Sequence, residues 1–203
     1  MPRMPTLHFI RHGDTEASGD GVFCGDLDIP LAPSGVTQAA ALAGAVRKWK
    51  VESVFVSSKL RARMTAEPTC RALGLDAKVE EGLREIGYGT WEGRHESEIR
   101  ASEPEAFAAW TGDPGTRSPP GGESGFTIAA RAMPIVARIA ETHAGDVLIF
   151  SHKATIRIIT CVLLGISVSR FRDRVACPTA SITTFTFGGH GPLLTRLGET
   201  AAG

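Results

Sequence analysis

Short apolar runs that end in polar side chains constrain this chain more than any other feature of its sequence. Asp146–Ser151, DVLIFS, has the length and apolar character of a buried strand, and His152 follows it just before an apolar helical pattern. Thr6–Ile10 is a similar run that leads into Arg-His-Gly, and Ser53–Ser57 is a third. Strands that alternate with helices favour a parallel sheet covered by helices. The chain is therefore predicted to form a three-layer α/β/α sandwich with a mainly parallel central sheet.

Length, charge and cysteine usage exclude several classes of protein. The 203 residues suit one α/β domain, so residues 1–203 are assigned to a single domain. Lys plus Arg and Asp plus Glu each number 22, and this zero net charge argues against a charge-driven nucleic-acid or membrane-surface role. The four cysteines include no CxxC pair, so neither a disulfide framework nor a zinc site is indicated. Because no apolar stretch resembles a signal peptide or a membrane span, a cytoplasmic location is expected.

Between the expected strands, apolar residues recur at helical spacing, which predicts helices there. Ser34 and Ser124 are the expected N-caps of two helices, and Gly74 is the expected C-cap of a third. The helix after Ser124 is expected to pack inward through Phe126, Ala129, Met133, Val136 and Ala140. The other expected elements are helices at 34–48, from Arg61 to Gly74, at 95–101, 103–111 and 154–164, and strands at 77–80, 182–187 and 193–197.

Arg11, His12 and Gly13 suit the binding and attack of a phosphate group. An arginine side chain is a planar fork that matches phosphate oxygens. An imidazole is partly uncharged near neutral pH and can act as a nucleophile, and glycine lets a ligand approach the backbone. Ligands of open α/β sheets bind at the carboxyl ends of the strands, where these three residues are expected. These residues alone leave open a strand followed by a polar loop with a chance histidine.

The stretch RHGDT resembles the signature of the histidine phosphatase superfamily, the phosphoglycerate-mutase-like enzymes. Further stretches match the family pattern in the same order, so that the resemblance covers most of the chain. These stretches are Ser57 with Arg61-Ala62 and Thr65-Ala66, LREIGYGTWEG at 83–93, PGGES at 120–124, and Ser151-His152. The chain departs from the family pattern at Lys153, where the family usually has Gly, and at Ser18, where it often has Asn.

The resemblance implies a metal-independent phosphomonoesterase, of the histidine acid phosphatase type, that needs no cofactor. His12 would be the nucleophile that becomes a phosphohistidine, and Glu85 would protonate the leaving alcohol and then accept a proton from water. Arg11, Arg61 and His152 would hold the phosphoryl oxygens. The expected substrate-binding residues are Arg11, Ser18, Cys24, Gly25, Arg61 and Lys153. In the same region Trp91 is expected to be a packing residue, and Glu92 and Glu96 are expected to be surface carboxylates.

The expected substrate is a small phosphorylated metabolite, with neither nucleic acid nor membrane as a partner, and a homodimer is left open. One alternative is a phosphoglycerate mutase-type phosphoryl transfer, and another is a non-catalytic binding scaffold of the same fold. A mutase must shut water out of its site. Only 94–118 separate the WEG turn from PPGGES, and six residues, 198–203, follow the last expected strand, which is too little for a lid. Hydrolysis is therefore preferred to mutase chemistry.

Overall fold

The computed structural model describes residues 4–19 and 21–200, and a six-stranded mixed sheet lies at its centre. The strand order is β3-β2-β4-β1-β5-β6, with β3, β2, β4 and β1 parallel to one another and β5 and β6 added antiparallel. The predicted mainly parallel sheet is confirmed. The strands are β1 (Thr6–Arg11), β2 (Val51–Val56), β3 (Ala77–Val79), β4 (Asp146–Ser151), β5 (Ser181–Gly188) and β6 (Gly191–Thr200).

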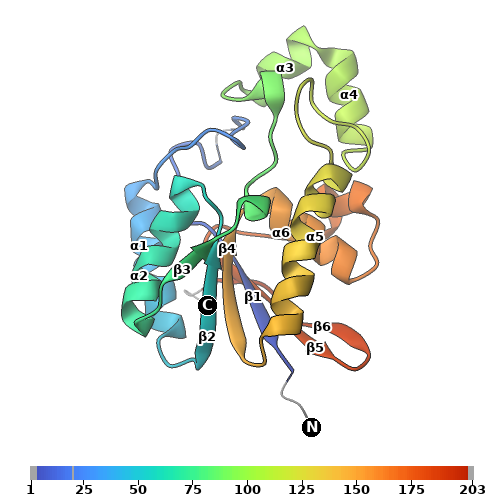
Figure 1. Ribbon diagram of the computed structural model, residues 1–203. Coiled ribbons are helices and arrows are strands. Elements are labelled where there is room, and N and C mark those ends of the chain that lie inside the picture. The colour runs from blue at the N-terminus through green and yellow to red at the C-terminus, as the bar shows by residue number, and fades with distance from the viewer. Residues whose placement is uncertain (1–3, 20, 201–203) are drawn as a thin grey trace.

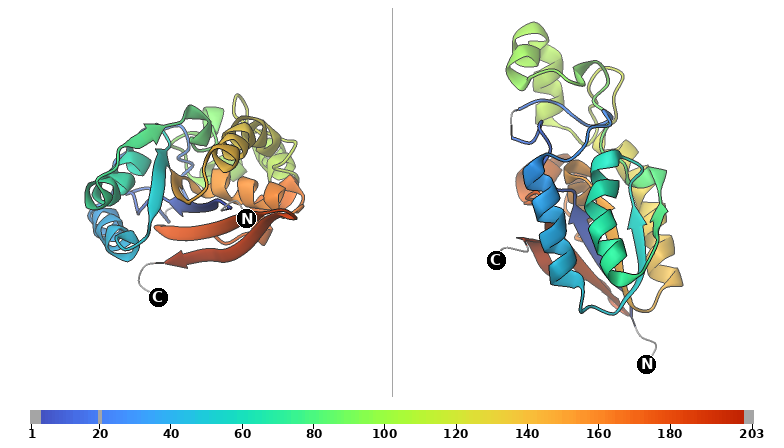
Figure 2. Two further views of the ribbon diagram at one scale, coloured as in Figure 1. Left: turned by 60° about the horizontal axis from the view of Figure 1, so that its bottom comes forward. Right: turned by 90° about the vertical axis from the view of Figure 1, so that its left-hand side faces the viewer.

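Helices cover both faces of the sheet and give the three predicted layers. Figures 1 and 2 show α1 and α2 together on one face and α5 and α6 on the other. The helices are α1 (Pro33–Val46), α2 (Leu60–Leu73), α3 (Glu96–Ser102), α4 (Pro104–Gly112), α5 (Gly125–Thr142), α6 (Lys153–Leu163) and α7 (Phe171–Arg174), with 3₁₀ turns at Glu81–Leu83, Gly89–Trp91 and Val168–Arg170. Among the helices of the described residues, none has the length and hydropathy needed to cross a membrane.

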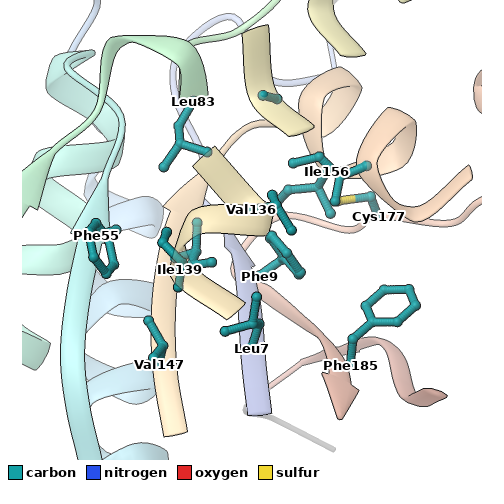
Figure 3. Packing of buried hydrophobic residues seen from close by; sticks show 13 residues of the cluster. Leu7, Phe9, Phe55, Leu83, Val136, Ile139, Val147, Ile156, Cys177 and Phe185 are labelled. Carbon is teal, nitrogen blue, oxygen red and sulfur yellow. The ribbon is translucent and has the colours of Figure 1, made fainter. Parts of the chain in front are cut away.

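The central strands are buried on both faces, so that neighbouring side chains of one strand enter different cores. Leu7 and Phe9 of β1 pack toward α5 and α6, where they meet Val136 and Ile139 (Figure 3). Ile10 of the same strand faces the other way and packs with α1 and α2. Burying a large apolar side chain contributes about 1.5–3 kcal/mol. The continuous apolar character of these strands follows from this burial on both faces.

The register of the sheet brings the two strand-end histidines together. Arg11 of β1 pairs with Ser151 of β4, and the His12 N–H donates to the Ser151 carbonyl at 3.1 Å. His12 and His152 therefore follow adjacent parallel strands at the same level. On the far side of β4, the Ser57 N–H donates to the Phe150 carbonyl at 2.9 Å, which places the end of β2 at the same edge.

Two helix details differ from the sequence prediction. Ser34 does not cap α1, because the helix begins one residue earlier with Pro33 in its first turn and Ala32 as N-cap. Proline suits that place, since it lacks the N–H that would have no partner there. Ser124 does cap α5, as predicted, but Phe126 is 52% exposed. The buried stripe of α5 consists of Ile128, Ala132, Val136 and Ile139. Phe126 lies about 200° around the helix axis from Ile128, so its side chain is directed away from this stripe.

A small helical cap lies beyond the carboxyl ends of the strands. In Figures 1 and 2, α3 and α4 (green) and the segment after β1 (blue) lie at this end of the molecule. An aromatic cluster joins them, in which Phe23 of that segment packs against Trp91 and Trp110. Trp91 is fully buried and its Nε1–H donates to Glu103 at 2.9 Å, which confirms its predicted packing role.

Candidate active site

A cavity of about 710 Å³ lies between the strand ends and the helical cap. It is lined by the end of β1, the segment after it, the start of α6, and residues of α3, α4 and α7. Most of the side chains proposed from sequence line this one cavity: Arg11, His12, Ser18, Cys24, Arg61, Glu85 and Lys153. Gly25 and His152 are not among the lining residues.

His12 is held with one ring nitrogen free. Its Nδ1 lies 2.7 Å from the Gly13 carbonyl oxygen, which can only accept a hydrogen bond, so Nδ1 carries the proton. The Nε2 lone pair is then available for attack. Burial lowers the pKa of His12 well below its ordinary value of 6.5, and the cations Arg61 and Arg11 lower that pKa further. The imidazole is therefore neutral at physiological pH, as a nucleophile requires.

His152 lies beside His12, with 5.2 Å between the two ring centroids. Its Nε2 is 2.7 Å from the Ser57 hydroxyl, whereas its buried Nδ1 has no hydrogen-bond partner among the described residues. Burial, Arg61 and His12, in that order of effect, hold the pKa of His152 well below 6.5. The ring is neutral, and it is close enough to His12 for one phosphoryl group to contact both imidazoles.

Arg11 and Arg61 bring two guanidinium groups to the cavity, each fixed by backbone carbonyls. Arg11 donates to the Cys177 carbonyl at 2.8 Å, and its Nε–H has no partner within the described structure. Arg61 is 1% exposed and donates to the carbonyls of Leu27 and Gly25 at 2.8 and 2.7 Å. Because these contacts leave further N–H groups on each fork, both side chains are preorganised donors for an anion.

Glu85 is a buried carboxyl group at the N-terminus of α6. One oxygen accepts the Ile86 N–H at 3.0 Å, and the N–H groups of Ala154 and Thr155 donate to the carboxylate at 3.2 and 3.3 Å. A helix N-terminus provides such donors and a favourable dipole for an anion. These bonds fix the position of the carboxylate in the cavity wall, on which His12 and Arg61 also lie.

Gly25 and Glu92 form the support for Arg61. The Glu92 carboxylate accepts the N–H groups of Gly25, Asp26 and Tyr88 at 2.8–3.0 Å. The prediction that Glu92 is a surface carboxylate is therefore wrong, since a segment far along the chain supplies its donors. Gly25 in turn gives its carbonyl to Arg61, and a Cβ at this position would lie 1.7 Å from the Ile86 carbonyl oxygen.

Replacing Glu92 with Ala should destabilise the protein, because three backbone N–H groups lose their acceptor. Hydrogen bonds to charged groups contribute about 1.5–3 kcal/mol, so we expect a loss of about 2 kcal/mol and a fall in Tm of roughly 4–8 °C. Differential scanning calorimetry measures this change. Glu98→Ala is the matched control, because the Glu98 carboxylate is 60% exposed and should shift Tm by about 1 °C or less. Equal falls in Tm for both variants would contradict the role of Glu92 in supporting the Arg61 loop.

Two of the proposed binding residues, and one residue expected at the surface, have other partners or settings. The Ser18 hydroxyl accepts the Thr15 N–H at 2.9 Å, so this side chain holds its own loop as well as lining the cavity. Burial raises the pKa of the Cys24 thiol, which keeps it protonated. Glu96, expected at the surface, is partly buried, lines the cavity and pairs with Arg100 at 2.8 Å.

Sequence reasoning missed several cavity residues. Arg157 follows Lys153 by one helical turn on α6, and this i, i+4 spacing could have identified it. Tyr88, Arg100 and Arg172 reach the cavity from separate segments, and no local signal points to them. Within residues 4–19 and 21–200, no group of three His, Cys, Asp or Glu side chains is arranged to hold a metal ion.

Known proteins resemble this chain over most of its length. The family profile described as "Histidine phosphatase superfamily (branch 1)" matches residues 7–200. The chain is 32% identical over 178 residues to a glucosyl-3-phosphoglycerate phosphatase of Mycobacterium tuberculosis, a match that covers 83% of this chain and 79% of the relative. It is 29% identical over 179 residues to phosphoserine phosphatase 1 of Hydrogenobacter thermophilus, covering 88% and 84%. A solved structure of mycobacterial glucosyl-3-phosphoglycerate phosphatase with VO3 is similar with a TM-score of 0.88 and 28% identity, covering 96% and 99%.

Proposed function

Because this chain is a phosphatase of the histidine phosphatase superfamily (branch 1), we propose that it hydrolyses small phosphate monoesters through a phosphohistidine on His12. The observation that carries this proposal is the state of His12. Its imidazole is neutral, its Nδ1 proton is bound to Gly13, and its Nε2 lies in a cavity lined by Arg11 and Arg61. A neutral nucleophile between fixed cations is what attack on a phosphate dianion requires.

In the first step His12 Nε2 attacks the phosphorus, and the bond from phosphorus to the ester oxygen breaks. Arg11 and Arg61 neutralise the charge on the oxygens of the phosphoryl group in transfer. Glu85, in its protonated form, gives its proton to the leaving oxygen, and a free alcohol departs. In the second step the Glu85 carboxylate takes a proton from water, the resulting hydroxide attacks the phosphorus, and phosphate leaves His12.

His152 is assigned a hydrogen bond to the same phosphoryl group. If the Ser57 hydroxyl donates to His152 Nε2, the proton of the neutral ring lies on Nδ1, which has no other partner in the described structure. With 5.2 Å between the two ring centroids, Nδ1–H can reach an oxygen of a phosphoryl group bound to His12. Ser57 therefore acts by setting the tautomer of His152.

The expected result of a phosphatase screen is phosphate release from several small phosphate monoesters, with activity retained in EDTA. Guanidinium and imidazole groups supply the positive charge that a metal would otherwise provide. Phosphate release is measured with and without the chelator, and p-nitrophenyl phosphate serves as the general substrate. Activity that EDTA removes and magnesium restores would contradict the metal-free mechanism.

The same screen separates hydrolysis from phosphoryl transfer within the substrate. The protein is given 3-phosphoglycerate with a trace of the 2,3-bisphosphate, and phosphate and 2-phosphoglycerate are followed together. Hydrolysis is expected to be faster, because water can enter a cavity that is open to solvent. Isomerisation faster than phosphate release would identify a mutase, and neither product from any ester would favour a non-catalytic scaffold.

A further inference from the structure

The side chains that line the cavity carry a net positive charge, although the whole chain has none. Among the described residues, six cationic and three acidic side chains line it, whereas the whole chain has a formal net charge of zero. Arg11 and Arg61 are assigned to the phosphoryl group, which carries about two negative charges. The remaining four cations are Arg100, Lys153, Arg157 and Arg172. The cavity therefore has more positive charge than a phosphate monoester of a neutral alcohol needs.

Two of these four cations already have partners. Arg100 pairs with Glu96 at 2.8 Å. The Arg172 guanidinium lies over the Trp110 ring, 4.2 Å from its centroid, which is a favourable cation–π arrangement. These two side chains therefore belong to the wall of the cap, and their charge is partly compensated without a ligand.

Lys153 and Arg157 differ from that pair, since in the part of the chain that the structure describes neither lies within ion-pair distance of a carboxylate and neither lies over an aromatic ring. The Arg157 Nε–H is shielded from solvent and has no hydrogen-bond partner there. A buried donor without an acceptor is destabilising. A bound anion would supply the missing acceptor.

The two cations are also placed to act on one group. They are four residues apart on α6, so they lie on the same face of the helix, one turn apart. Lys153 is exposed as a whole residue, but partial burial beside the cavity lowers its pKa, and the nearby cations Arg157 and Arg11 lower that pKa further. Three positive groups therefore repel one another in the empty cavity, and a second negative charge on the ligand would relieve this repulsion.

We infer that Lys153 and Arg157 form a subsite for a second anionic group on the substrate, either a carboxylate or another phosphate carried by the alcohol near its ester oxygen. The inference rests on the proposed hydrolysis at His12, which fixes the position of the first phosphate. It names the substrate class as phosphorylated hydroxy acids and bisphosphates, in preference to phosphate esters of neutral alcohols.

Matched substrates test the subsite. 3-Phosphoglycerate differs from glycerol 3-phosphate in carrying a carboxylate in place of a hydroxymethyl group, and fructose 1,6-bisphosphate differs from fructose 6-phosphate by a second phosphate. We expect kcat/KM to be at least about tenfold higher for the more anionic member of one pair, since a hydrogen bond to a charged group is worth about that factor or more. The pair that shows the preference identifies the group bound.

Variants test whether Lys153 and Arg157 cause the preference for the more anionic substrate. Lys153→Gln and Arg157→Gln should each reduce the ratio of kcat/KM between the two members of the preferred pair by about tenfold, which brings the ratio toward 1. Arg100→Gln is the control, because it removes a cation of the same cavity that already has a carboxylate partner. This control should leave the ratio unchanged, since a general loss of positive potential lowers kcat/KM for both members.

Three outcomes would overturn the inference: no preference in either pair, an unchanged ratio in both α6 variants, or an equal fall in the ratio for Arg100→Gln. Wild-type protein that hydrolyses no ester, p-nitrophenyl phosphate included, would instead overturn the proposed function. Calorimetric binding of 3-phosphoglycerate and of fructose 1,6-bisphosphate, each against its less anionic partner, then tests the subsite without turnover. Equal affinities within both pairs, or a preference that Arg157→Gln leaves unchanged, would reject it.

Discussion

His12→Ala is expected to lower kcat/KM on p-nitrophenyl phosphate by about ten-thousandfold or more, the scale of loss when a covalent nucleophile is removed. No other described side chain combines a neutral imidazole, a free Nε2 and a place in the cavity wall between Arg11 and Arg61. Alanine also removes the acid-labile phosphoenzyme, because no nitrogen remains to carry the phosphoryl group.

The measurement combines steady-state kinetics with rapid quenching of radiolabelled substrate, which traps the phosphoenzyme at alkaline pH. His190→Ala is the matched control, since His190 is exposed in the turn between β5 and β6 and should leave both signals unchanged. A labelled protein that persists in His12→Ala, with the label on another residue, would show that the nucleophile has been misassigned.

Glu85→Gln is expected to lower kcat/KM, which reports the first step, by roughly 100- to 10,000-fold on alkyl phosphates, the usual contribution of a general acid. The loss on p-nitrophenyl phosphate should be much smaller, because a nitrophenolate leaves without a proton. Glutamine keeps one oxygen, which can accept the Ile86 and Thr155 N–H groups that Glu85 Oε1 accepts, and only the Ala154 N–H loses its acceptor.

A series of esters whose alcohols differ in pKa measures this contrast as the slope of log(kcat/KM) against leaving-group pKa. The slope should be steeper in Glu85→Gln than in the wild type. Glu96→Gln is the control, since Glu96 also lines the cavity but is paired with Arg100. Parallel slopes, with equal losses on aryl and alkyl esters, would remove Glu85 from the role of acid.

The local sequence was sufficient to predict most helices and strands, and to place His12 and His152 directly after strands. The strands that precede His12 and His152 are short apolar runs, and burial on both faces of a parallel sheet requires such runs. The cap at Ser124 and the left-handed Gly74 after α2 were predictable because each depends on the chemistry of one residue. The start of α1 was misjudged, since two adjacent residues, Pro33 and Ser34, both carried start signals.

The roles of charged side chains depended on segments distant in the sequence. Glu92 seemed exposed because its local sequence is polar, yet its carboxylate accepts N–H groups of a loop more than sixty residues earlier. Arg100 and Arg172 join the cavity from α3 and α7, and their local sequences resemble those of ordinary surface helices. Phe126 was assigned inward from its hydrophobicity, whereas the face that α5 presents depends on what packs against it.

By itself the sequence determined the mainly parallel sheet, because strand patterning is a local property, and its resemblance to the histidine phosphatase superfamily identified the groups proposed for phosphoryl transfer. The tertiary structure decided the distances between those groups and their burial. The register of β1 against β4 brings two histidines to a centroid distance of 5.2 Å. Burial keeps them neutral, and folding places Lys153 and Arg157 in the cavity without carboxylate partners among the described residues. Distances and burial arise only when distant segments pack together, and local sequence does not contain them.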